Sequence, residues 1–177
     1  MNMTDYPRHL VKHHVLWNGT PVTIRPIRAE DSGMEQDFVR HLSEESRYSR
    51  FMGMLRELPE RKLEYFTHID YDRHMAFVAT VEHEGKEVEV GVARYVATGA
   101  PDTCEFAITV DDAWQKTGIA GLLMIALQDA ARRNGFKTME GMVLGSNRKM
   151  IKFARQLGFT VHREAGEGDT VHVALQL

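Results

Sequence analysis

The hydrophobic and polar positions of this chain follow two periods, and each change of period marks a new element. Apolar and polar residues alternate over 22–27, which is typical of a half-buried strand, and Pro26 favours the edge of a sheet. Helical spacing follows over 30–42, after an acidic cap, and again over 59–69, where Pro59 suits a first helical turn. The N-terminal half is therefore predicted to begin with a strand and two helices.

The middle of the chain returns to a period of two. Residues 75–81 and 88–97 are rich in β-forming side chains and flank Glu84-Gly85-Lys86-Glu87, which predicts a hairpin. A third run over 103–110 follows a turn at 99–102. We therefore expect three consecutive antiparallel strands.

The last third of the chain alternates helices and strands. A strongly amphipathic helix runs from Ile119 to a C-cap at Gly135. The later elements are predicted as a strand over 138–144, a helix over 147–157, and strands over 159–163 and 170–177. The predicted order, β-α-α-β-β-β-α-β-α-β-β, is an α/β fold with a mixed sheet.

Composition narrows the class of protein. A chain of 177 residues with 43% hydrophobic and 27% charged residues fits one globular domain, expected over 21–177 behind an N-terminal arm at 1–20 that lacks a period. The formal net charge of −3 argues against a nucleic-acid partner. There is no apolar run of membrane-spanning length, and the first residues lack the apolar core of a signal peptide, so we expect a cytoplasmic protein without a membrane partner.

No metal site is predicted. His9 and His13 have a spacing that binds metal on a helix, and His14 follows, but no acidic or cysteine partner lies nearby. The single cysteine, Cys104, excludes an internal disulfide and a cysteine-based zinc site, and its apolar strand favours a packed thiol.

A glycine-containing turn between the strand at 103–110 and the next helix is the strongest chemical signal. It reads Gln115-Lys116-Thr117-Gly118-Ile119-Ala120-Gly121. Such a turn leaves backbone N–H groups free at the positive end of a helix dipole, which suits a phosphate. By itself the turn is a weak signal, because glycine before a helix is more often part of an ordinary strand-to-helix connection.

The element order and two motifs resemble the GNAT superfamily of acyl-CoA N-acyltransferases. The turn from Gln115 to Ala120 is similar to the pyrophosphate signature of that superfamily, and Asn147 with Gly158-Phe159 is similar to its second signature. The resemblance implies a GNAT-like fold with acetyl-CoA as co-substrate. The residues that it implies for coenzyme binding are Ile108, Val110, Gln115, Lys116, Thr117, Gly118, Ile119, Ala120, Gly121, Asn147 and Phe153.

A closer resemblance lies in the segments 22–27, 42–51 and 66–72, which look like the acetyltransferase domain of bacterial Pat-type protein lysine acetyltransferases. Larger members of that group carry a fused region similar to acyl-CoA synthetases, which is absent from this sequence. The resemblance implies a small standalone acyltransferase.

An acceptor amine with a pKa of about 10.4 must lose a proton before it attacks a thioester. Glu105 holds a position that resembles that of the proposed base of Pat-type enzymes, and burial among Cys104, Phe106 and Val92 or a bridging water would help it act. The alternative is a solvent-facing Glu105, or one paired with Arg94. The resemblance also implies that a backbone N–H near Val110 binds the oxyanion.

One position departs from the superfamily pattern. A tyrosine that often serves as general acid is replaced here by Ala154. Because a thiol pKa lies near 8.5, water or Ser146 could supply the proton.

The acceptor side is expected between Leu42 and Asp72. Glu44, Glu45, Asp70 and Asp72 could attract a protein lysine or a polyamine, although a solvated surface interleaved with arginines is the alternative. Three functions follow: a protein lysine acetyltransferase, an acetyltransferase of a small amine, and a non-catalytic acetyl-CoA-binding module. The last two strands suggest a possible homodimer.

Overall fold

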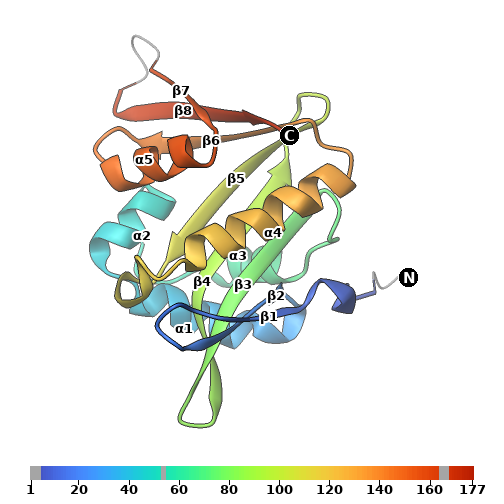
Figure 1. Cartoon of the computed structure of the whole chain (residues 1–177), viewed down its shortest axis with the longest axis vertical. Coiled ribbons are helices and arrows are strands. Elements are labelled where there is room, and N and C mark those ends of the chain that lie inside the picture. Colours follow the sequence, from blue (N-terminus) through green and yellow to red (C-terminus); the bar gives the residue numbers. More distant parts are fainter. Residues whose placement is uncertain (1–4, 53–54, 164–167) are drawn as a thin grey trace.

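The protein is built on one eight-stranded sheet, seen in the computed structural model of the chain (Figure 1), which describes residues 5–52, 55–163 and 168–177. The strand order is β1-β2-β3-β4-β5-β6-β8-β7, and all neighbours are antiparallel except β5 and β6. The strands are β1 (Lys12–Val15), β2 (Pro21–Pro26), β3 (His74–His83), β4 (Lys86–Ala97), β5 (Thr103–Val110), β6 (Thr138–Leu144), β7 (Thr160–His162) and β8 (Thr170–Gln176). The predicted α/β class with a mixed sheet is confirmed.

Helices cover the two faces of the sheet. The α-helices are α1 (Ser32–His41), α2 (Glu44–Phe51), α3 (Glu60–Thr67), α4 (Ile119–Arg133) and α5 (Arg148–Gln156), and short 3-10 helices are η1 (Arg8–Leu10), η2 (Ala29–Asp31) and η3 (Asp112–Trp114). Helices α1 and α3 share one core cluster with β3 and β4, whereas α4 and α5 belong to the cluster on the opposite face. None of the helices in the described part of the chain is long and apolar enough to cross a membrane.

The central strands confirm the meander. β3, β4 and β5 are antiparallel neighbours, and a two-residue turn joins β3 to β4. Glu84 and Gly85 have φ angles of 51° and 79°, which the mirror-image hairpin turns require.

Three expectations need correction. Residues 12–15 of the expected N-terminal arm form β1 and pair with β2. β2 is consequently not the edge strand, and Pro26 is tolerated because the pairing with β1 reaches only to Ile24, opposite the first residue of β1. The sequence also missed α2, since no residue of this helix is buried and its two aromatic residues, Tyr48 and Phe51, are too few to show an apolar period.

The sheet splits between β5 and β6, and this split positions the site. The two strands pair only at Thr103 to Glu105 with Thr138 to Glu140. Beyond this point the Phe106 ring lies over Gly141, where an added Cβ would come within 2.6 Å of the ring carbon Cε1. The strands continue without pairing to each other, so the sheet opens at their C-terminal ends.

Candidate active site

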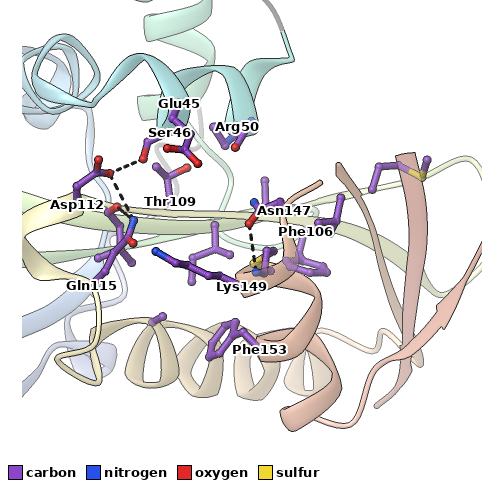
Figure 2. A pocket seen from close by; sticks show the side chains of 18 of the residues that line it. Glu45, Ser46, Arg50, Phe106, Thr109, Asp112, Gln115, Asn147, Lys149 and Phe153 are labelled. Atoms are coloured by element: carbon purple, nitrogen blue, oxygen red, sulfur yellow. Dashed lines mark hydrogen bonds between the residues drawn. The ribbon is translucent and has the colours of Figure 1, made fainter. Parts of the chain in front are cut away.

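A pocket of about 450 Å³ lies where β5 and β6 have separated (Figure 2). Its walls come from β5, β6, the turn before α4, the start of α5, and α2. The lining residues are Glu45, Ser46, Ser49, Arg50, Met52, Phe106, Ala107, Ile108, Thr109, Val110, Asp112, Gln115, Ala120, Met142, Val143, Asn147, Lys149, Met150 and Phe153.

The backbone of β5 presents to this pocket groups that are not bonded to β4. Asp111 donates its N–H to the Val90 carbonyl, and the β4–β5 register then places alternate residues in hydrogen bonds with β4. By this alternation the backbone groups of Phe106, Ile108 and Val110 face the gap. The carbonyl of Val110 accepts a 3.3 Å hydrogen bond from Gln115 Nε2, which joins β5 to the following turn.

The glycine turn has the backbone geometry of an anion cradle. Lys116 and Gly118 have φ angles of 63° and 93°, and Gly118 precedes the first residue of α4. No side chain caps this helix. The N–H groups of the first helical turn are therefore available to a ligand. The positive end of the helix dipole favours a negatively charged ligand at this place.

The predicted coenzyme residues occupy this region in different ways. Six line the pocket: Ile108, Val110, Gln115, Ala120, Asn147 and Phe153. Lys116, Thr117, Gly118, Ile119 and Gly121 belong to the turn or the first turn of α4 but do not line it. Ile119 is buried with 1% of its surface exposed, so it can offer only its backbone. The Thr117 hydroxyl donates to the Trp114 carbonyl at 2.5 Å and holds the turn.

Asn147 has a structural task as well. Its Oδ1 accepts a 3.2 Å hydrogen bond from the Met150 N–H and caps α5. Ala154, which replaces the superfamily's tyrosine, is completely buried and does not line the pocket. Ser146 does not line it either. Neither side chain contributes a proton donor to the pocket walls.

Glu105 stands at the point where the sheet splits. It belongs to the last residue pair between β5 and β6. It lies opposite Val96 of β4, whose side chain is on the same face of the sheet as Val92, and this face is covered by α1 to α3. The side chain is exposed, so the expected burial among Cys104, Phe106 and Val92 is wrong. Within the described residues the side chain of Glu105 makes no hydrogen bond and no ion pair, with Arg94 or any other group.

A second carboxylate lies beside Glu105, which the sequence analysis missed. Glu140 is its direct partner in the parallel register, and such partners project from the same face of a sheet. His172 Nε2 lies 3.1 Å from Glu140 Oε2. Only the register of two strands that are distant in sequence could have revealed this neighbour.

Fewer of the acidic residues expected on the acceptor side line the pocket than the sequence suggested. Glu45 lines the pocket, whereas Glu44, Asp70 and Asp72 do not. Asp70 accepts backbone hydrogen bonds from Asp72 and His74, both at 2.9 Å, and therefore shapes a turn.

The loop after β5 is joined to α2 through Asp112. Ser46 donates its hydroxyl proton to Asp112, and this bond, with one from Ser43, lowers the pKa of Asp112. The contact connects the acceptor-side helix to the turn that begins at Gln115, as Figure 2 shows. The Leu42–Asp72 region includes residues 53–54, which lie outside the described residues.

Buried charges lie behind the pocket wall. Glu35, Glu89 and Arg94 are each less than 5% exposed, and both oxygens of Glu89 lack a hydrogen-bond partner among the described residues. Burial, and next the charge of Glu35, raise the pKa of Glu89 well above its usual range. Arg94 Nη1 lies 2.9 Å from His74 Nε2 and donates to the Phe66 carbonyl at 3.1 Å.

Two predictions about the remaining residues can be assessed. Cys104 is fully buried, and burial raises its pKa to about 12, which confirms a packed thiol. His13 and His14 belong to a strand, so helical spacing does not apply to them. In the described ranges no three His, Cys, Asp or Glu side chains form a group that could hold a metal ion.

The fold and site define an acyltransferase of the GNAT type, and comparison with known proteins agrees. The family model for the Acetyltransferase (GNAT) family matches residues 37–159. The chain belongs to this family and is an acetyltransferase.

Individual relatives place the chain more closely. Acetyltransferase PA5475 of Pseudomonas aeruginosa is 39% identical over 154 residues, which cover 87% of this chain and 83% of that protein. The crystal structure of the GNAT domain of S. lividans PAT is 30% identical, with a TM-score of 0.87 over 98% of this chain and 100% of the other.

More distant structures share the fold. A cAMP-binding acyltransferase from Mycobacterium smegmatis is 26% identical with a TM-score of 0.63, and this chain spans 48% of its length. The structure of yncA from Salmonella typhimurium with acetyl-CoA is 22% identical, with a TM-score of 0.70 over 88% of this chain and 94% of the other.

Proposed function

We propose that this enzyme transfers an acetyl group from acetyl-CoA to a primary amine, with a protein lysine as the favoured acceptor. The split between β5 and β6 carries the proposal. It joins an uncapped helix N-terminus, suited to a pyrophosphate, to backbone groups of β5 that are not bonded to β4, suited to the amides of a pantetheine arm, and ends at a carboxylate. The likeness to the GNAT domain of S. lividans PAT supports the choice of acceptor. The structure of yncA with acetyl-CoA supports the choice of acetyl donor.

In the proposed reaction Glu105 is the general base. It accepts one proton from the acceptor ammonium, and because its side chain is exposed, a water can carry that proton between them. The amine nitrogen then forms a bond to the thioester carbon, and the backbone N–H of Val110 stabilises the oxyanion. The nitrogen then gives its second excess proton to water, collapse breaks the C–S bond, and the thiolate takes a proton from water.

The coenzyme contacts are proposed for the residues named from the sequence. Ile108 and Val110 bind the pantetheine arm through their backbones, and the turn from Gln115 to Gly121 binds the pyrophosphate. Asn147 and Phe153, on α5, form the opposite wall. Metal is not required in this scheme.

Glu105→Gln tests the base. We expect a loss of turnover of about 10²- to 10⁴-fold with unchanged coenzyme A affinity by calorimetry. Glu82→Gln is the matched control, since this exposed glutamate lies on β3 outside the pocket. Glu140→Gln tests the neighbouring carboxylate. Full activity of Glu105→Gln with a large loss in Glu140→Gln would assign the general base to Glu140.

Acceptor panels test the substrate class. Free-thiol release and mass spectrometry for acetyl-lysine would be compared for proteins and for free amines. Fast turnover on small amines without labelled protein would favour the small-amine function. Acetyl-CoA binding without turnover on any acceptor would contradict the proposed reaction.

A further inference from the structure

Arg50 is a pocket-lining cation without a polar partner. It lies on α2, is half-buried, and makes no hydrogen bond or ion pair with any residue in the described part of the chain. Aromatic rings position it instead: its Cζ lies 4.9 Å from the centroid of Phe51 and 5.6 Å from that of Phe66. The guanidinium edge, which carries the hydrogen-bond donors, is thus left unused.

The surroundings of Arg50 favour an additional negative charge. Burial, and next repulsion from Arg94, lower the pKa of Arg50 to about 10, so it remains charged at neutral pH. Glu35 and Glu105 oppose this lowering, but each has a smaller effect than Arg94.

Arg94 cannot itself bind a ligand in the pocket. It lies behind Phe66, with its Cζ 4.0 Å from the ring centroid, and its Nη2 atom is buried. Phe66 therefore lies against two guanidinium groups, of which only Arg50 lines the pocket. A partly desolvated arginine with free donors is well suited to a carboxylate, which it can bind through two hydrogen bonds.

We infer that Arg50 binds a carboxylate that the acceptor carries close to its reacting amine. The inference rests on the proposed function and specifies the acceptor further. The amine is then directed to Glu105, whose charge acts on Arg50. Glu45, on the same helix as Arg50, and Asp112 also line the pocket. The phosphates of the coenzyme are expected to bind at the turn from Gln115 to Gly121 and not at Arg50. Figure 2 shows Gln115 and Arg50 on opposite sides of the pocket.

Two sources supply this chemistry. The carboxylate belongs either to a free amino acid or to an acidic residue beside a lysine in a protein. The experiment therefore uses acceptor pairs that differ in the carboxylate: lysine against cadaverine, and short peptides with Glu-Lys against the same peptides with Gln-Lys. The pair that shows the preference identifies the source.

The readout is kcat/KM for each acceptor by free-thiol release. We expect the wild-type enzyme to prefer the carboxylate member of one pair by about 10- to 100-fold, the range of a hydrogen-bonded charged contact. Arg50→Gln should abolish the preference by raising KM for that member, with activity on the neutral member within about twofold. Arg50→Lys, which keeps the charge, should retain part of the preference.

Controls separate this role from folding and coenzyme binding. Arg56→Gln removes an exposed arginine that does not line the pocket and should keep the preference. Coenzyme A affinity should be unchanged in Arg50→Gln, and a loss of that affinity would assign Arg50 to the coenzyme. Equal rates on both members of both pairs in the wild type would overturn the inference while leaving the acetyltransferase function intact. Absence of transfer to every amine would overturn both.

Discussion

His74 should make the protein sensitive to mild acid. It is 7% exposed, packs against the ring of Tyr65, and its Nε2 lies 2.9 Å from Nη1 of Arg94. Burial, and next the charge of Arg94, lower the pKa of His74 from 6.5 to about 4, although Asp70 opposes the shift. A neutral ring accepts the hydrogen bond from Arg94, whereas a protonated ring would place two cations in contact.

The sign and size of the effect follow from this shift. Between pH 6.5 and 4 the unfolded chain binds more protons at this position than the folded protein, so stability falls as the pH falls. At 1.36 kcal/mol per pKa unit, His74 should remove about 2 kcal/mol of unfolding free energy by pH 5 and about 3 kcal/mol by pH 4. Below about pH 3, where the folded protein is protonated here as well, its contribution should change no further.

Urea unfolding between pH 7 and pH 4 measures the effect. His74→Gln keeps a hydrogen-bond acceptor for Arg94 but cannot be protonated, so its stability should fall less steeply than that of the wild type. The exposed His41→Gln serves as control and should follow the wild-type curve. Parallel curves for wild type and His74→Gln would refute the reasoning.

Three further predictions concern stability and the shape of the site. Glu89→Gln should stabilise the protein at pH 8 and have less effect at pH 5. Burial and Glu35 raise the pKa of this carboxyl, so its ionisation costs stability as the pH rises, and glutamine avoids that cost. Equal denaturation midpoints for wild type and variant at pH 8 would contradict this. Gly141→Ala should cost about 1–3 kcal/mol in urea unfolding, because the new methyl would come within 2.6 Å of the Phe106 ring, and a second change, Phe106→Leu, should restore part of the loss. Gly118→Ala should cost about 1–2 kcal/mol, as its φ of 93° disfavours a side chain, and should weaken coenzyme A binding in calorimetry; unchanged values of both would exclude a strained turn.

The donor side of the site could be predicted because its signals are local. The turn from Gln115 to Gly121 depends on chain neighbours and on the helix that follows, and the periodicity of that helix is evident in the sequence. The place of Asn147 at the start of α5 was accessible for the same reason, since a side-chain cap acts within three residues.

The acceptor side could not be predicted in this way. α2 has no buried residue and thus no apolar period, so neither the helix nor the position of Arg50 was visible. Asp70 was given a role in attracting the acceptor, but its Oδ1 accepts two backbone hydrogen bonds instead. Charged residues carry no periodic signal that separates a pocket wall from a turn.

The sequence by itself therefore determined the order of the main elements, the meander and the turn before α4. These features follow from side-chain periods and turn chemistry within short stretches of chain. The tertiary structure decided where β5 and β6 separate, that Glu105 is exposed beside Glu140, and that Arg50 lines the pocket. Each of these depends on strand register or helix packing between residues far apart in the chain, which local patterns do not specify.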